Sequence, residues 1–280
     1  MPRARSNGIE IEYESFGDAS AEPVVLINGL GSQMTRWPAP FCEKLAARGY
    51  RAIRFDNRDV GLSTWPEAAY RLEDMAADVV GLLDHLQVRK AHVAGVSMGG
   101  MIAQLLAADH GERVLSLTSI MSTPQDPMLA QPGEAPSPAA AAAQAPDPKA
   151  DFEGFVAFGM ALARQIGSPG FPFEEAYLRQ RVIDEYRRAY NPAGVQRQTA
   201  AIRASGDRTE KARRIQVPTV VLHGDRDPLI PPAGGEATAR AIPGAELRII
   251  EGMGHDVPPL LFDTIIDAIV AAAERARAAA

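Results

Sequence analysis

Residues 95–99 read Gly-Val-Ser-Met-Gly, and this pentapeptide constrains the fold more than any other part of the chain. It follows a short apolar run, Ala91–Ala94, and opens a helix-like run from Met98 to Ala108. A serine between two glycines at a strand-to-helix junction is typical of a sharp turn that exposes a nucleophile, because flanking side chains would not fit there. The pattern therefore predicts a parallel sheet with Ser97 at the tip of one strand.

Several other short segments are apolar at nearly every position, as parallel strands covered by helices on both faces are. They are residues 24–27, 52–55, 114–120 and 217–222. Residues 9–14 instead alternate between apolar and charged side chains, which predicts an antiparallel strand at the sheet edge. Helical periodicity over 72–86 and 260–277 alternates with these strands. We therefore predict an α/β protein with a mostly parallel central sheet flanked by helices.

One region breaks this alternation after the sixth strand. Residues 123–150 are rich in Pro and Ala, which predicts a flexible loop, and residues 151–214 have helical character. We predict that 123–214 forms a helical cap on a core domain made of 1–122 and 215–280. Five of the nine phenylalanines lie in the first part of this helical stretch. Phe152 and Phe155 are expected to face a substrate pocket, or to pack the cap on the core, and the two roles are compatible.

A serine hydroxyl needs a neighbouring base to act as a nucleophile. Candidates for the acid and for the histidine of a catalytic triad follow Ser97 in that order. Asp225 and Asp227 both follow the strand 217–222. We select Asp227, because it lies further past the strand end in a loop constrained by prolines, and expect Asp225 to accept N–H groups of the turn. His255, in the turn Gly-Met-Gly-His after strand 246–250, is the predicted general base.

The remaining histidines have simpler interpretations. We expect surface or packing roles for His85, His92 and His110, and a loop-supporting role for His223. A metal site formed by His223, Asp225 and Asp227 would lack ligands from a second element, so we predict no metal site there.

The negative charge that develops during acyl transfer needs two donors. We predict the backbone N–H of Met98 and that of Leu30, in the Gly-rich loop 28–32. The alternative is an ordinary glycine turn, whereas a phosphate loop would need a lysine that is missing here. The predicted pocket lining is Gly29, Met34, Trp37 and Met253 together with Phe152 and Phe155. Each could equally belong to the core, but as a set they favour hydrophobic or aromatic substrates.

Three stretches carry a family resemblance. They are 27–37 (INGLGSQMTRW), 55–63 (FDNRDVGLS) and 95–103 (GVSMGGMIA). The chain resembles the α/β-hydrolase superfamily over almost its whole length. Within it, the first two stretches resemble the aclacinomycin methylesterase group of bacterial esterases, and the third is also similar but is shared more broadly. The resemblance implies hydrolysis of carboxylic esters without a cofactor. It also implies a triad of Ser97, Asp227 and His255 beside an oxyanion hole at Leu30 and Met98.

Two positions within these stretches need comment. Asn28 stands where a histidine often precedes the glycine of the oxyanion loop, which changes the local hydrogen bonding but leaves the backbone donor. Asp56 and Arg58 are expected to brace the loops under the site rather than to take part in the chemistry.

Composition excludes several classes of partner. Asp and Glu outnumber Lys and Arg by 35 to 29, so the net charge is −6 and no basic surface for nucleic acid is expected. The single cysteine, Cys42, excludes an internal disulfide. We find no signal peptide and no apolar run that could cross a membrane. We therefore expect a cytoplasmic monomer or homodimer whose partner is a small-molecule ester.

The leading hypothesis is thus a serine hydrolase that cleaves esters through an acyl-enzyme. Two alternatives use the same triad, namely cofactor-free perhydrolysis with haloperoxidase activity and C–C bond hydrolysis. A non-catalytic ligand-binding protein is a third. Epoxide hydrolases and dehalogenases would need an aspartate at position 97.

Overall fold

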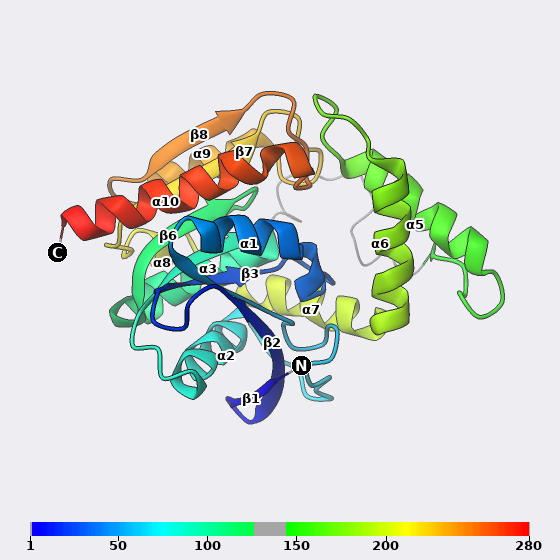
Figure 1. Ribbon diagram of the computed structural model, residues 1–280, viewed down its shortest axis with the longest axis horizontal. Coiled ribbons are helices and arrows are strands. Elements are labelled where there is room, and N and C mark those ends of the chain that lie inside the picture. Colours follow the sequence, from blue (N-terminus) through cyan, green and yellow to red (C-terminus); the bar gives the residue numbers. More distant parts are fainter. Residues whose placement is uncertain (1, 126–143, 280) are drawn as a thin grey trace.

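The computed structural model describes residues 2–125 and 144–279, and within them the chain forms one eight-stranded sheet between two layers of helices (Figure 1). The strand order is β1-β2-β4-β3-β5-β6-β7-β8. The strands are β1 (Arg3–Ser6), β2 (Ile9–Phe16), β3 (Glu22–Ile27), β4 (Tyr50–Phe55), β5 (Ala91–Val96), β6 (Val114–Ile120), β7 (Thr219–Gly224) and β8 (Glu246–Ile250). In this order, every neighbouring pair from β4 to β8 is parallel, whereas β1 pairs antiparallel with β2, and β2 with β4. The predicted mostly parallel sheet is therefore confirmed.

Helices cover both faces of the sheet (Figure 1). One face carries α1 (Ala39–Ala47) and α10 (Phe262–Ala278), and the other carries α2 (Leu72–His85), α3 (Met98–Asp109) and α9 (Pro232–Ala241). Short 3-10 turns are η1 (Met34–Arg36), η2 (Gly111–Arg113) and η3 (Pro259–Leu261). Within the described ranges, no helix is long and apolar enough to span a membrane.

Strand β3 shows why this sequence forms a sheet with two buried faces. Val25 and Ile27 belong to the apolar cluster under α2 and α3, while Val24 and Leu26 belong to the cluster under α1 and α10. All four side chains are completely buried. Burial of each one stabilises the fold by about 1.5–3 kcal/mol, so an apolar run without alternation is what a central strand needs.

The prediction that residues 9–14 form the edge strand is wrong. β1 pairs outside β2, with Arg3 opposite Glu12, and so occupies the edge. Its sequence, Arg-Ala-Arg-Ser, gives little strand signal, but Ala4 is fully buried and the Ser6 hydroxyl donates to the Asp78 carbonyl at 2.7 Å. Contact with α2, distant in sequence, stabilises this strand.

In the described part of the segment between β6 and β7 lie four helices, which we call the inserted helices: α5 (Phe152–Ile166), α6 (Glu175–Arg188), α7 (Pro192–Ser205) and α8 (Thr209–Ala212). In Figure 1, α5 and α6 stand apart from the sheet, at the right of the view. By contrast, α7 packs on α2, and α8 packs on α3 and α9. The second half of the insertion is thus continuous with the core. Most of the predicted flexible loop, residues 126–143, lies outside the described part of the chain.

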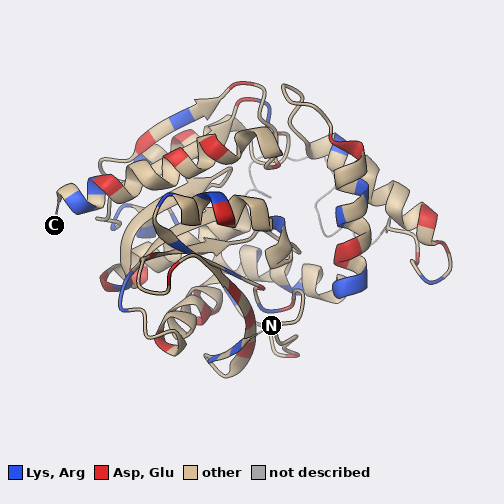
Figure 2. Ribbon diagram, in the orientation of Figure 1, with Lys and Arg blue, Asp and Glu red and all other residues tan. Residues whose placement is uncertain are grey.

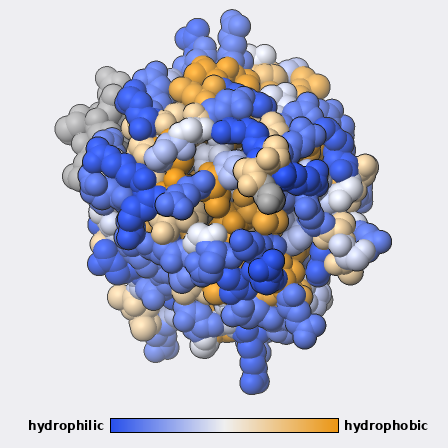
Figure 3. Space-filling model, turned by 90° about the vertical axis from the view of Figure 1, so that its left-hand side faces the viewer, coloured by the Kyte–Doolittle hydropathy of each residue, from blue (hydrophilic) through white to orange (hydrophobic). Residues whose placement is uncertain are grey.

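Charged residues follow these layers. Figure 2 shows the central strands nearly free of charge, while α6 and α10 carry both basic and acidic residues. Figure 3 views the end of the molecule opposite α5 and α6, where hydrophilic side chains frame an apolar region.

Candidate active site

Ser97 lies in the sharp turn between β5 and α3, at the C-terminal end of the parallel strands. Its backbone has φ 57° and ψ −124°, a conformation that side chains other than glycine seldom adopt. Two hydrogen bonds hold it there: the Ser97 N–H donates to the Ile120 carbonyl at 2.9 Å, and the Ser122 hydroxyl donates to the Ser97 carbonyl at 2.8 Å. Both partners come from β6 and the residues that follow it, so the neighbouring strand stabilises the strained turn.

The two glycines of the pentapeptide are required by close backbone contacts. A Cβ on Gly95 would lie 2.1 Å from the Gly99 carbonyl oxygen, and a Cβ on Gly99 would lie 2.3 Å from the Ile27 carbonyl oxygen. Real Cβ atoms do not approach other atoms this closely. Any larger residue at either position would therefore move α3 away from β3 and β5, and Ser97 with it.

The structure brings Ser97, His255 and Asp227 together. The distance between Ser97 Oγ and His255 Nε2 is 2.9 Å, and that between His255 Nδ1 and Asp227 Oδ2 is 2.7 Å. Asp227 is 5% exposed, and its other oxygen, Oδ1, accepts the N–H groups of Leu229 and Ile230, each at 2.9 Å. These bonds fix the carboxylate, which in turn favours the tautomer with a proton on Nδ1 and a free lone pair on Nε2.

Asp225 does not contact His255, and its expected role needs correction. Asp227 itself accepts the N–H groups of the β7 turn, whereas Asp225 Oδ1 accepts the Gly252 N–H at 2.6 Å. Asp225 thus ties the β7 turn to the loop that carries His255. His223 has the expected supporting role: it is fully buried and its Nε2 lies 2.8 Å from the Ile230 carbonyl.

The loop with His255 is also bonded to the inserted helices. The His255 N–H donates to the Ile166 carbonyl at 2.7 Å, at the end of α5, and the Gly254 N–H donates to Ser168 Oγ at 2.9 Å. The Ser168 hydroxyl donates in turn to the Asp256 carboxylate. Burial raises the pKa of Asp256, next to the catalytic candidate. The position of His255 therefore depends on the linker between α5 and α6.

The two predicted backbone donors lie on either side of Ser97. Met98 is the first residue of α3, so its N–H has no acceptor inside the helix. Leu30 lies in the loop after β3, residues 28–33, which we call the glycine loop. In the part of the chain that the structure describes, the Leu30 N–H has no hydrogen-bond acceptor. A Cβ on Gly29 would be 3.2 Å from Ser97 Cβ, so this loop passes directly over the serine.

The other predicted pocket residues differ in burial, since Phe152 and Phe155 are only partly buried. Met34, Trp37 and Met253 are completely buried, and Trp37 packs on Phe41 with ring centroids 4.9 Å apart. Trp37 and Met253 belong to the cluster under α1 and α10, which is their core interpretation. Phe152 and Phe155 both contact Tyr186, at 5.4 Å between centroids, and so join α5 to α6.

Charged side chains also accompany the apolar ones on this side of the molecule. Arg36 on η1 pairs with Glu185 on α6. Burial, together with repulsion from Arg36, lowers the pKa of Arg181 to about 10. Asp256 is among the carboxylates whose attraction opposes this shift. This charged cluster, made of Arg36, Arg181, Glu185 and Asp256, has no signal in the sequence, because its members come from three separate segments of the chain.

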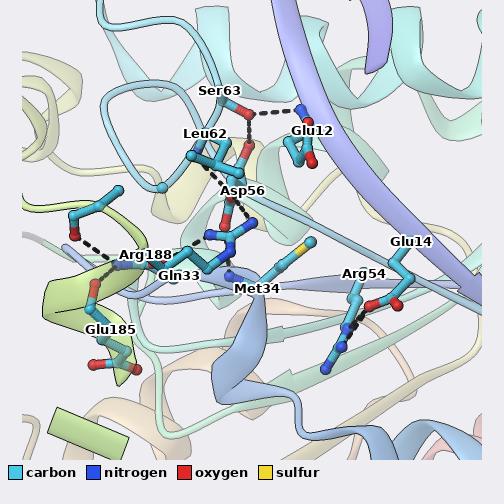
Figure 4. A network of polar contacts seen from close by, with 12 residues as sticks. Glu12, Glu14, Gln33, Met34, Arg54, Asp56, Leu62, Ser63, Glu185 and Arg188 are labelled. Carbon is cyan, nitrogen blue, oxygen red and sulfur yellow. Dashed lines mark hydrogen bonds and ion pairs between the residues drawn. The ribbon is translucent and has the colours of Figure 1, made fainter. Parts of the chain in front are cut away.

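The residues expected to brace the site do so. Asp56, after β4, accepts the Met34 N–H at 2.7 Å and the Leu62 N–H at 3.0 Å (Figure 4). Arg58 forms a buried ion pair with Asp78 at 2.6 Å. Of the described residues, no group of three or more His, Cys, Asp or Glu side chains is arranged to hold a metal ion.

Comparison with known proteins now adds to this geometry. A family model described as the alpha/beta hydrolase fold matches residues 22–259. A rhodomycin D methylesterase of Streptomyces sp. (strain C5) is 32% identical, and the match covers 92% of this chain and 93% of that protein. The chain belongs to the α/β-hydrolase family. Its predicted resemblance to bacterial methylesterases is confirmed as well.

Other relatives of this α/β hydrolase have different names. A non-heme haloperoxidase of Rhodococcus erythropolis is 28% identical, with 93% of this chain and 94% of that protein covered. The solved enol-lactonase of Burkholderia xenovorans LB400 superposes with a TM-score of 0.79 at 28% identity, with 97% and 99% of the two chains covered. The predicted fold class is thus confirmed, while the names of the relatives differ in the reaction they describe.

Sequence reasoning missed the residues that hold the glycine loop from outside. Gln198 on α7 accepts the N–H of Gly31, and Arg188 on α6 donates to the side chain of Gln33. No local pattern marks them, since both lie on amphipathic helices among many polar residues. Only the hydrogen bonds of the inserted helices to the loops after β3 and β4 identify them.

Proposed function

We propose that this protein hydrolyses carboxylic esters of hydrophobic or aromatic small molecules through an acyl-enzyme on Ser97. The enzyme class, a carboxylic-ester hydrolase, agrees with relatives named rhodomycin D methylesterase and 3-oxoadipate enol-lactonase. The observation that carries the proposal is the continuous chain of contacts from Ser97 Oγ to His255 and on to Asp227, at 2.9 and 2.7 Å.

The proposed reaction has two steps. Ser97 Oγ attacks the ester carbonyl while its proton passes to His255 Nε2, and the Asp227 carboxylate stabilises the resulting imidazolium. The C–O bond to the alcohol then breaks, and His255 returns the proton to the leaving oxygen. Water, activated by the same imidazole, attacks the acyl-enzyme and releases the acid and free Ser97.

The N–H groups of Met98 and Leu30 would stabilise the negative oxygen in both steps. Support comes from their position beside Ser97 and from the lack of another acceptor for either N–H among residues 2–125 and 144–279. Donors fixed in advance need no reorganisation when the charge appears, which is why such sites commonly supply a large share of catalysis.

The test is the loss of activity in Ser97→Ala, measured with p-nitrophenyl butyrate and with methyl and aryl ester panels. We expect kcat to fall by at least about 1,000-fold, as for other catalytic triads. A fluorophosphonate should label wild type and not the variant. Ser116→Ala removes a buried hydroxyl near the start of β6 and should keep both activity and label. Near-wild-type turnover by Ser97→Ala would refute the proposal.

Perhydrolysis is the second candidate, because relatives named haloperoxidase match most of the chain. In it, hydrogen peroxide in place of water would attack the acyl-enzyme and release a peracid. Initial rates with an ester alone, with acetate plus peroxide, and with a 1,3-diketone separate ester hydrolysis from perhydrolysis and from C–C cleavage. A rate with peroxide that exceeds ester hydrolysis would favour this second candidate.

A further inference from the structure

The glycine loop contains two glycines and carries the Leu30 N–H, yet its own sequence provides little to keep it rigid. Gly31 has φ +65° and Gly29 lies against Ser97. Within the loop, the Ser32 N–H donates to the Gly29 carbonyl at 3.2 Å. A backbone this permissive needs outside contacts if one N–H is to stay pointed at a substrate oxygen.

Gln198, on the inserted helix α7, supplies one such contact. Its side chain is completely buried, and its Oε1 accepts the Gly31 N–H at 2.8 Å. Its Nε2 donates to the Arg58 carbonyl, also at 2.8 Å, so the amide is fixed at both ends. Val195, one turn earlier on α7, packs so closely that a Cβ on Gly31 would be 2.9 Å from its Cγ2.

The far end of the glycine loop is held by α6. The Gln33 side chain donates to the Glu185 and Ala189 carbonyls at 2.7 and 2.9 Å, and accepts from Arg188 Nη1 at 2.8 Å. Figure 4 shows Arg188 lying between Gln33 and Asp56, the carboxylate that also accepts the Met34 N–H. The inserted helices thus hold the loop at two points that follow Leu30, namely Gly31 and Gln33.

We propose that Gln198 is a positioning residue for the oxyanion hole, and that Gln33 of the glycine loop assists it through its hydrogen bonds to Glu185, Arg188 and Ala189. By engaging the Gly31 N–H, Gln198 turns the Leu30–Gly31 peptide toward α7 and leaves the Leu30 N–H directed at Ser97. The inference rests on the proposed function. It adds that the inserted helices, which carry none of the triad residues, set the rate of acyl transfer through two hydrogen-bonded glutamines.

The experiment compares Gln198→Met with wild type on p-nitrophenyl butyrate. Methionine is close to glutamine in length but has no acceptor for the Gly31 N–H. Loss of a complete oxyanion donor costs roughly 100- to 1,000-fold in kcat, and we expect a displaced donor to cost at least about tenfold. KM should change by less than about threefold, because this contact is realised mainly in the transition state.

Two further readouts distinguish positioning from stability. The affinity for phenylboronic acid, whose adduct with Ser97 is tetrahedral, should weaken together with kcat, while the pH dependence of kcat should keep its midpoint. Gln104→Met is the matched control: Gln104 is 2% exposed on α3 and its Nε2 donates to Ser119 Oγ at 3.0 Å. It should lower the melting temperature without lowering kcat.

A kcat within about twofold of wild type in Gln198→Met, or an equal loss in Gln104→Met, overturns the inference. If Gln198→Met does not fold, Gln33→Met asks the same question from the other side of the loop, with the same expected and refuting results. Failure of the proposed function has its own signature, because wild type itself would then show neither hydrolysis that depends on Ser97 nor fluorophosphonate labelling.

Discussion

Replacement of Gly99 by alanine tests the packing of the nucleophile turn. The new Cβ would lie 2.3 Å from the Ile27 carbonyl oxygen and 2.6 Å from that of Asn28. The first distance falls short of 3.0 Å, below which real Cβ contacts essentially do not occur, by about 0.7 Å. Both obstacles are backbone atoms, so no side chain can rotate away. Either α3 or the start of the glycine loop must move.

The expected size of the effect follows from two opposing terms. Overpacking against rigid neighbours costs about 1–3 kcal/mol, and the upper end applies here because the neighbours are backbone. Alanine is about 1 kcal/mol better than glycine in a helix, which offsets part of this cost. A net loss of about 2 kcal/mol lowers the melting temperature of a domain this size by roughly 4–8 °C. A displacement approaching 1 Å at the reacting atoms should also reduce kcat about 100-fold.

Differential scanning calorimetry and p-nitrophenyl butyrate turnover measure both effects on the same preparation. Gly111→Ala is the control, because a Cβ there meets nothing within 4 Å and the backbone φ is not positive. We expect that variant to keep its activity and to change stability by less than about 1 kcal/mol. Wild-type stability and turnover in Gly99→Ala would refute this reasoning, because they would show that the turn accommodates a Cβ without displacement of the backbone.

Two more predictions concern single side chains. Asp227→Asn should lower kcat by about 10,000-fold at near-wild-type stability, since the amide favours the wrong tautomer of His255. Asp225→Ala should instead lower the melting temperature and leave most of kcat. Equal losses of kcat in the two variants would contradict this division of roles. Burial lowers the pKa of His92, so below the ordinary histidine pKa of about 6.5 the unfolded chain binds a proton that the folded chain does not, and stability falls as pH drops from about 7.5 to about 5.5. In thermal melts over this range, His92→Gln should show a smaller fall of the melting temperature than wild type, and an unchanged slope in this variant would refute the argument.

Sequence patterns predicted well those features that depend on neighbours along the chain. The pentapeptide around Ser97, the apolar strands and the turn before His255 each carry their signal within about ten residues. The order serine, aspartate, histidine then follows, because all three come after parallel strands, whose C-terminal ends share one edge of the sheet. The structure places Ser97, Asp227 and His255 within hydrogen-bond distance at that edge.

Features that depend on residues distant in the chain could not be predicted from the sequence. β1 is stabilised by α2, more than 70 residues away, and its polar sequence gave no indication of a strand. Asp225 was expected to accept N–H groups of its own turn, but it accepts the N–H of Gly252, because the loop after β8 brings that group within reach. Gln198 is more than 160 residues from its partner Gly31. In each case the deciding contact is tertiary, and residue type alone is compatible with several outcomes.

The hydrogen bond from the His255 N–H to the Ile166 carbonyl has a consequence for anyone who exchanges segments between relatives. A chimera with foreign residues in place of α5 and the linker after it would also replace the residue whose carbonyl accepts the N–H of His255, the proposed general base. A graft that ignores 166–170 would lose turnover on every ester alike, and the result would be mistaken for a change of specificity. Substrate range can be redesigned in this scaffold only if residues 166–170 are kept together with the core domain.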